Sequence, residues 1–411
     1  MTSKYSRLPF RVAVVLIATL FLAGVAAATT EQFLHNFPER AEGGARNTLL
    51  YASGNLYGTI STGGHITQDC SDGCGMVFEL APSGSGGWNY RTLYRFRGKG
   101  DGAFPVGRLI MDAGGNLYGA TERGGAAGGS CHHFCGIVFK LTPSSTGEWT
   151  KSLIFAFSLD NGSMPESGVT MDASGNLFGT TLGGGANLLG EVYELKPNSD
   201  GTWTQEVIYS FTGLADGHSP RAEVTLDAAG NVYGTTSAGG LTQVGGAVFQ
   251  LTPNSGGWTE TTLYSFVDAT GCGATAPLLL DSAGDLLGTA TGCGPGKNGV
   301  DFELIRNSDN TWTEKTLHAF GGVGDGGTPE SGLTPDGRGN YYGTTLGTVY
   351  MLKPTSSGSW TEAVIFSFPS GNSGDCGEVF AGITIGKAGT LYGVCSFGGP
   401  LGGGSVFQLS R

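Results

Sequence analysis

Short apolar runs separated by glycine-rich turns recur along the chain from residue 30 onward. The runs are five to nine residues long, rich in β-branched and aromatic residues, and bounded by Gly, Pro, Asn, Asp and Ser. This pattern is typical of β-strands joined by turns. Alternation within one run predicts Tyr264 and Phe266 on one face and Leu263 and Ser265 on the other. After residue 28 no run keeps a 3.6-residue period, which indicates an all-β fold.

The runs belong to a repeat. The pattern G-N-L-Y-G occurs in seven variants, 50 to 61 residues apart, which begin at Gly54, Gly115, Gly175, Gly230, Gly284, Gly339 and Gly389. Each copy contains an apolar run that ends near Asp, then NLYGTT, then G-x-V-F-x-L, and finally W-T-E-x-x-L-Y-S-F. Four strands in a unit of about 55 residues predict the blade of a β-propeller.

The last copy lacks its fourth run, and a matching run lies at the other end of the chain. Residues 30–37 read TEQFLHNF, and residues 313–320 read TEKTLHAF. We therefore expect a single domain, residues 29–411, folded as a seven-bladed β-propeller with four strands per blade. The amino-terminal strand, about residues 30–37, completes the last blade and closes the ring. A linear solenoid is the alternative, but it does not require a divided terminal unit.

The first 28 residues have the three parts of a secretory signal peptide. Lys4, Arg7 and Arg11 are followed by an apolar stretch and by three alanines ending at Ala28. Cleavage there places the mature protein outside the cytoplasm, as a secreted, periplasmic or cell-surface protein. An uncleaved anchor is the alternative. No later apolar run reaches the ~18 residues of a membrane span.

Charge and composition exclude some functions. The chain has 75 glycines in 411 residues, only 14% charged residues and a net charge of −12. Removal of residues 1–28 takes away three basic residues and leaves −15. Nucleic-acid binding requires a basic surface, so no nucleic-acid partner is expected.

The cysteines occur in loops that share one end of the predicted ring, which we call the variable face. It comprises the loops between second and third strands and the connections between blades, and it holds most inserts, cysteines and histidines. An even cysteine count in an exported protein favours disulfides. The repeat predicts four local pairs: Cys70–Cys74, Cys131–Cys135, Cys272–Cys293 and Cys376–Cys395. In CHHFC (131–135), two thiolates and two imidazoles offer zinc as the alternative. The equivalent CSDGC has no histidine, which favours a disulfide.

The repeat units resemble the GloVer tandem repeat of secreted bacterial "choice-of-anchor" proteins over essentially all of residues 30–411. Their D-x-x-G-N-L-Y element is also similar to the NHL repeats of propellers. The first resemblance implies an exported bacterial propeller, often with a carboxyl-terminal sorting segment. The chain ends in SVFQLSR without one, so we expect release or periplasmic residence. The second resemblance implies ligand binding, protein binding or lyase chemistry.

Charged residues should gather where the channel opens on the variable face. They lie four to six positions before the Asp that ends each first strand, and are Arg46, Arg108, Glu166, Arg221, Glu223 and Glu330. Converging carboxylates and guanidinium groups can bind a polar ligand, bind Ca²⁺ or support acid–base chemistry. A solvated rim of mutually neutralising charges is the alternative interpretation.

The sequence favours binding over catalysis. G-x-S-x-G and HExxH are absent, and the glycine-rich loops lead into strands rather than helices. The loops of the D-G-x-x-P type lack the alternating ligand spacing of calcium loops, so we expect no metal or cofactor. We expect an exported, non-catalytic propeller that binds a glycan, peptide or partner protein. The alternatives are a lyase or hydrolase acting on a small or sugar-like substrate at the mouth, and a structural surface module.

Overall fold

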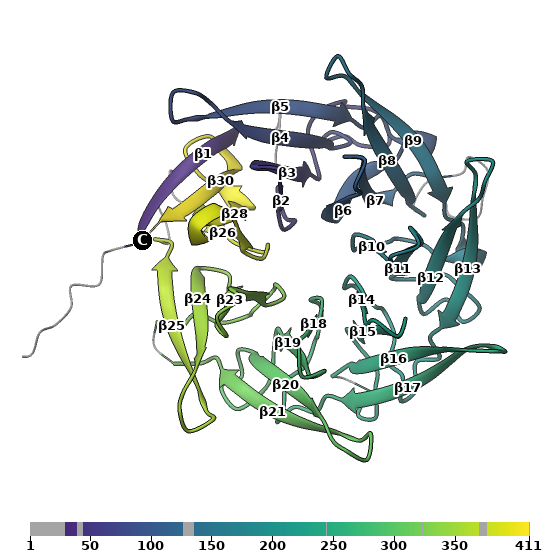
Figure 1. Cartoon of the computed structure of the whole chain (residues 1–411), viewed down its shortest axis with the longest axis vertical. Coiled ribbons are helices and arrows are strands. Elements are labelled where there is room, and N and C mark those ends of the chain that lie inside the picture. Colours follow the sequence, from purple (N-terminus) through teal and green to yellow (C-terminus); the bar gives the residue numbers. More distant parts are fainter. Residues whose placement is uncertain are drawn as a thin grey trace, which may run out of the picture.

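Seven β-sheets stand around a central opening in the computed structural model of the protein (Figure 1). The structure describes residues 29–38, 44–125, 135–243, 245–322, 324–369 and 376–410. The described residues contain strands and three single-turn 3₁₀ segments: η1 (Lys99–Asp101), η2 (Leu159–Asn161) and η3 (Lys387–Gly389). The fold is a seven-bladed β-propeller, as the repeat predicted.

Blades 1 to 4 are consecutive in the chain. Their strands are β2 (Leu50–Ala52), β3 (Asn55–Ile60), β4 (Met76–Pro82) and β5 (Trp88–Arg95); β6 (Ala103–Met111), β7 (Leu117–Arg123), β8 (Ile137–Pro143) and β9 (Trp149–Ala156); β10 (Thr170–Met171), β11 (Leu177–Thr181), β12 (Glu191–Pro197) and β13 (Trp203–Ser210); and β14 (Thr225–Leu226), β15 (Val232–Thr236), β16 (Ala247–Asn254) and β17 (Gly257–Ser265).

Blades 5 and 6 repeat this order, and blade 7 joins both ends of the chain. Their strands are β18 (Leu279–Leu280), β19 (Leu286–Ala290), β20 (Val300–Arg306) and β21 (Trp312–Ala319); β22 (Thr334–Pro335), β23 (Tyr341–Thr344), β24 (Thr348–Pro354) and β25 (Trp360–Ser367); and β27 (Thr384–Ile385), β28 (Leu391–Cys395), β30 (Gly402–Ser410) and β1 (Thr30–Pro38). Two further short strands, β26 (Cys376–Glu378) and β29 (Phe397–Gly398), extend blade 7.

The amino-terminal strand closes the ring. β1 pairs antiparallel with β30, from Thr30 opposite Ser410 to Pro38 opposite Gly402. Figure 1 shows β1, in purple, along the outer edge of the yellow carboxyl-terminal blade. The predicted closure by residues 30–37 is therefore confirmed. It joins residues far apart in the sequence and covers the edge of β30 that would otherwise be unpaired.

A ring of aromatic pairs forms the core between blades. The aromatic residue at the end of the fourth strand of one blade, or just after it, contacts the aromatic residue on the third strand of the next, with centroids 4.9 to 5.5 Å apart. The seven pairs are Phe37–Phe78, Phe96–Phe139, Phe157–Tyr193, Phe211–Phe249, Phe266–Phe302, Phe320–Tyr350 and Phe368–Phe407. One of them, Phe37–Phe78, joins the amino-terminal strand to blade 1.

The aspartates that end the first strands stabilise the turns on the opposite face, which is the end of the ring away from the variable face. Asp112 accepts hydrogen bonds from the amides of Gly114 (2.9 Å) and Asn116 (2.8 Å), and the Asn116 side chain donates to its second oxygen at 2.7 Å. Asp172, Asp227 and Asp336 repeat the arrangement. The carboxylate therefore stabilises the turn by accepting hydrogen bonds from the residues that follow it, as the sequence indicated.

The glycine of NLYGT is required by packing. Its α-carbon lies against the aromatic ring of the third strand, and a Cβ added at Gly234 would stand 2.5 Å from Cζ of Phe249. Real Cβ atoms do not approach this closely, so a side chain here forces the ring or the strand to move.

We expect Gly234→Ala to lower the free energy of unfolding by about 1–3 kcal/mol, because it overpacks the core. Gly84→Ala is the matched control, since an added Cβ there meets no atom within 4 Å, and it should change stability by less than ~0.5 kcal/mol. Urea denaturation of both variants measures the difference. Equal stabilities for the two variants would show that the close contact does not constrain this position.

The simple alternation predicted for the fourth strand is wrong at one position. Tyr264 lies opposite Val248 and Thr262 opposite Phe249, so Leu263 is the extra residue of a β-bulge. Leu263 is partly buried and packs with Tyr264 against the core. Bulges turn a strand's side chains without a change in residue type, which is why the sequence pattern did not reveal it.

Three predicted disulfides are present: Cys70–Cys74, Cys272–Cys293 and Cys376–Cys395, with Cα atoms 5.2, 5.4 and 5.3 Å apart. Cys135 is disulfide-bonded; Cys131, His132 and His133 of CHHFC lie outside the described residues. Residues 1–28 lie outside them as well. No helix within the described ranges is long and apolar enough to cross a membrane.

Candidate functional site

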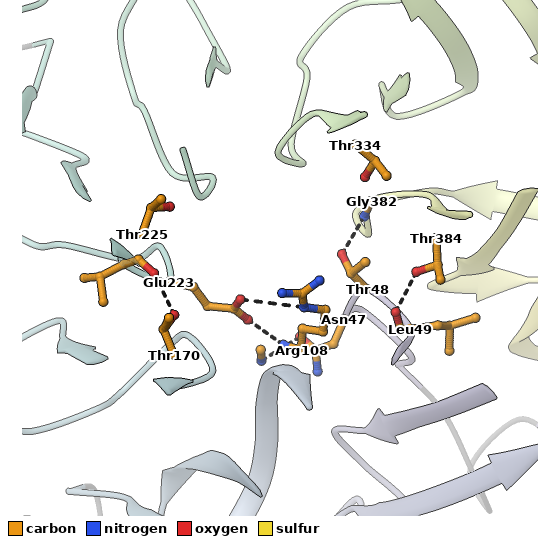
Figure 2. Close-up of polar contacts among 12 residues, drawn as sticks. Asn47, Thr48, Leu49, Arg108, Thr170, Glu223, Thr225, Thr334, Gly382 and Thr384 are labelled. Atoms are coloured by element: carbon orange, nitrogen blue, oxygen red, sulfur yellow. Dashed lines mark hydrogen bonds and ion pairs between the residues drawn. The ribbon is translucent and has the colours of Figure 1, made fainter. Parts of the chain in front are cut away.

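Hydrogen bonds between neighbouring first strands set the geometry of the channel. Thr170 donates from Oγ1 to the carbonyl oxygen of Val224 at 2.6 Å, and Thr225 donates in the same way to Leu278. At the junction of the two chain ends, the Gly382 amide donates to Thr48 and Thr384 donates to Leu49 (Figure 2). Hydrogen bonds between adjacent blades thus fix the positions of the first strands that line the channel.

The six charged residues singled out in the sequence line one cavity. Arg46, Arg108, Glu166, Arg221, Glu223 and Glu330 surround a channel cavity of about 590 Å³. Arg46, Glu166, Arg221 and Glu330 also line a wider cavity of about 1170 Å³, which we call the mouth. Convergence of these side chains from five blades is the feature a ligand site requires. Their role in binding stays a prediction.

Arg221 interacts electrostatically with two carboxylates, those of Glu166 and Glu330. Its Nη1 lies 2.9 Å from Oε2 of Glu166. Burial raises the pKa of Glu166, and the charge of Arg221 opposes the rise. Burial likewise raises the pKa of Glu330, again opposed by Arg221 and reinforced by Glu378. The three groups form a charged, half-buried cluster rather than side chains spread into solvent.

Glu223 lies deeper and is held by protein groups. Its Oε1 accepts the backbone amide of Arg108 at 2.7 Å, and its Oε2 lies 4.0 Å from the Arg108 guanidinium (Figure 2). Burial raises the pKa of Glu223, while the Arg108 charge and the amides of Arg108 and Gly168 lower it. The contacts connect blade 4 to blades 2 and 3, which favours a structural role for this pair within the channel.

Arg46 is supported by aromatic rings. Its guanidinium carbon lies 4.9 Å from the ring centroid of Phe397 and 5.5 Å from that of Phe380. Phe380 and Phe397 come from blade 7, whereas Arg46 precedes the first strand of blade 1. The cation is therefore held at the seam of the ring by cation–π contacts.

Three described histidines and the aspartate of one D-G-x-x-P loop contact neighbouring protein groups. His35 stacks on Tyr90 with centroids 4.0 Å apart, and His318 Nε2 lies 3.5 Å from Asp325. His218 contacts Ser219 at 2.9 Å. Asp216 accepts the amides of Thr212 and Leu214, as a turn residue does.

A cluster of three acidic residues lies on the opposite face. Asp281, Asp285 and Glu303 have carboxylate oxygens within 4.8 Å of one another, the spacing of metal ligands. Lys315 Nζ stands 3.3 Å from Glu303 and supplies positive charge there. Hence the lysine already balances part of this cluster.

The sequence pattern of the Gloeobacter/Verrucomicrobia repeat family matches residues 19–198 and 126–346, which is most of the chain. The protein belongs to this family. None of the curated proteins is a significant match to it. The GloVer resemblance drawn from the G-N-L-Y-G units is thereby confirmed.

Solved structures share the fold of this Gloeobacter/Verrucomicrobia repeat protein at low sequence identity. One is a virginiamycin B lyase from Staphylococcus aureus, with 13% identity, a TM-score of 0.55, and coverage of 93% of this chain and 99% of that one. Another is an ancestral GH74 enzyme, with 14% identity, a TM-score of 0.55, and coverage of 90% of this chain and 48% of that one. At this identity the likeness shows the propeller fold alone.

Three further residues of this repeat protein contribute to the mouth. Phe380 and Phe397 support Arg46, and Thr275 lines both cavities with a buried Oγ1 that has no hydrogen-bond partner among the described residues. These residues are uncharged, so the charge pattern of the sequence does not indicate them. Alignment of the first strands places Thr275 in register with the charged positions and could have indicated it.

Proposed function

We propose that this protein is an exported, non-catalytic β-propeller that binds a glycan, a peptide or a protein partner at the channel mouth of its variable face. The convergence of Arg46, Glu166, Arg221 and Glu330 on one cavity of about 1170 Å³ supports the proposal most strongly. Such a cavity is large enough for a drug-sized or larger ligand. Its paired charges match polar groups better than apolar ones.

Export is part of the proposal. Residues 1–28 have the pattern of a signal peptide, and described disulfides are compatible with an oxidising compartment. Disulfides that cross-link its loops also restrict the conformations of the variable face, which lowers the entropy cost of binding.

The double variant Glu166→Gln/Glu330→Gln is expected to weaken binding at the mouth by about tenfold or more, since hydrogen bonds to charged groups contribute roughly 1.5–3 kcal/mol. Glycan and peptide arrays identify the ligand, and calorimetric titration measures the change. Asp281→Asn/Glu303→Gln is the matched control, because it neutralises two carboxylates on the opposite face. Unchanged affinity in the mouth variant, or an equal loss in the control, rejects the mouth as the site.

A lyase or hydrolase is the second candidate, and one observation favours it. Burial raises the pKa of both Glu166 and Glu330, as is required of a carboxylic acid that donates a proton near neutral pH. The same double variant separates the two functions. An enzyme turns over a small or sugar-like substrate and loses turnover in this variant, whereas a binding protein releases no product.

A further inference from the structure

Among the residues that the structure describes, the mouth contains one cation, Arg46, that no carboxylate neutralises. Arg108 and Arg221 lie 4.0 and 2.9 Å from Glu223 and Glu166. Arg46 has no carboxylate within 4.0 Å among the residues that the structure describes; its contacts there are the rings of Phe380 and Phe397. Its side chain is exposed to the cavity that it lines.

The two phenyl rings hold the guanidinium without using its hydrogen-bonding capacity. Cation–π contacts involve the charge and the ring faces, while the N–H groups of arginine point outward in its plane. This fork of donors fits a carboxylate in a bidentate manner. Arg46 is thus oriented in advance for an anionic group that enters the mouth.

The rest of the mouth offers acceptors. Glu330 lines both cavities and makes no hydrogen bond or ion pair shorter than 4.0 Å with any described residue. Thr275 Oγ1 is buried in the same lining and has no partner among the described atoms. The Glu330 carboxylate and the Thr275 hydroxyl oxygen therefore lack hydrogen-bond donors among the described residues. A ligand with several hydroxyl groups can supply them.

We propose that the mouth binds an acidic oligosaccharide, with one uronic-acid carboxylate on Arg46 and sugar hydroxyls donating to Glu330 and Thr275; this rests on the function proposed above. Each uronic residue carries one carboxylate beside several hydroxyl donors. An acidic peptide brings carboxylates without neighbouring hydroxyls, so it offers Glu330 and Thr275 no sugar hydroxyl to pair with. A neutral glycan leaves Arg46 without an anion. The acidic sugar alone satisfies both parts of the lining.

The test is calorimetric titration of the full mature chain at low salt with trigalacturonate, a neutral galactose trisaccharide and a triglutamate peptide. We expect trigalacturonate to bind at least about tenfold more tightly than the other two. Arg46→Gln should remove that preference, and Arg46→Lys should retain part of it. Arg338→Gln, an exposed arginine on the opposite face, should leave it unchanged. Added salt should weaken binding of the native chain.

Three outcomes overturn the acidic-sugar proposal: tighter binding of the peptide, equal binding of the neutral trisaccharide, or unchanged trigalacturonate binding in Arg46→Gln. The proposed function survives them if the probe that does bind is lost in Glu166→Gln/Glu330→Gln. If no probe binds in a manner sensitive to either mouth variant, the acidic-sugar proposal is wrong, and titration of the array ligand against Glu166→Gln/Glu330→Gln decides the proposed function.

Discussion

Replacement of Phe37 by alanine is expected to lower the free energy of unfolding by about 3–5 kcal/mol, the usual cost of deleting a buried aromatic side chain. Phe37 is fully buried on the amino-terminal strand, and its ring packs 5.5 Å from that of Phe78 in blade 1. The contact joins the last blade to the first. Its loss therefore loosens the strand whose pairing with β30 closes the ring.

Two controls make this result specific. Gln32→Ala, at an exposed position of the same strand, should change stability by less than ~0.5 kcal/mol. Phe157→Ala, at the equivalent position of blade 2, should cost about as much as Phe37→Ala, because Phe157 packs on Tyr193 in the same way. Urea denaturation measures all three. A loss below ~0.5 kcal/mol in Phe37→Ala would mean that the strand does not hold the ring closed.

The second large effect concerns a polar pair buried between blades 5 and 6. The repeat places Val on the third strand of one blade beside an aromatic ring of the next, but here the two residues are Asp301 and Tyr350. Tyr350 donates its hydroxyl to Asp301 Oδ1 at 2.7 Å, and both side chains are fully buried. Asp301 Oδ2 has no partner among the described atoms.

Tyr350→Phe is expected to lower the free energy of unfolding by about 1–3 kcal/mol, because it leaves a buried carboxyl group without its donor. Asp301→Val should cost a similar amount, since it leaves the Tyr350 hydroxyl unpaired. The double variant restores the Val–Phe combination of the repeat and should approach or exceed native stability. Tyr193→Phe is the control, because the Tyr193 hydroxyl has no described partner. Additive losses in the double-mutant cycle would contradict this coupling.

The same pair should make stability depend on pH. Burial raises the pKa of Asp301 from 3.8 to about 8, with the Glu362 charge adding to the rise and the Tyr350 hydrogen bond opposing it. The folded chain therefore keeps this proton at pH values where the unfolded chain has released it. Its contribution is complete below about pH 4 and is lost as the pH rises to about 8. Asp301→Asn should flatten the curve in that range.

The fold was predictable because the same sequence pattern recurs in every blade. Seven G-N-L-Y-G units, the turn aspartates and the displaced run at residues 30–37 all point to one closed ring, and the cysteine spacing points to local disulfides. The bulge at Leu263 was not predictable, because the extra residue is of a type that the alternating pattern also allows.

The candidate site was predictable only in part. Alignment of the first strands brought six charges to one cavity, but it did not distinguish their surroundings. Glu223 turns into the channel and pairs with the backbone of Arg108, whereas Arg46 rests on two rings from the other end of the chain. Such differences depend on contacts across blades, which no local pattern records. Asp301 did leave a signal, as the one polar residue at the Val position of G-x-V-F-x-L.

The most direct test of ligand binding at the mouth is a crystal structure of the mature protein with the best-bound carbohydrate or peptide of the arrays. We predict that the ligand lies between Glu166, Arg221 and Glu330, with any anionic group on Arg46. A ligand bound on the opposite face or along the outer strands, with the mouth empty, would contradict the assignment of function to the charged mouth.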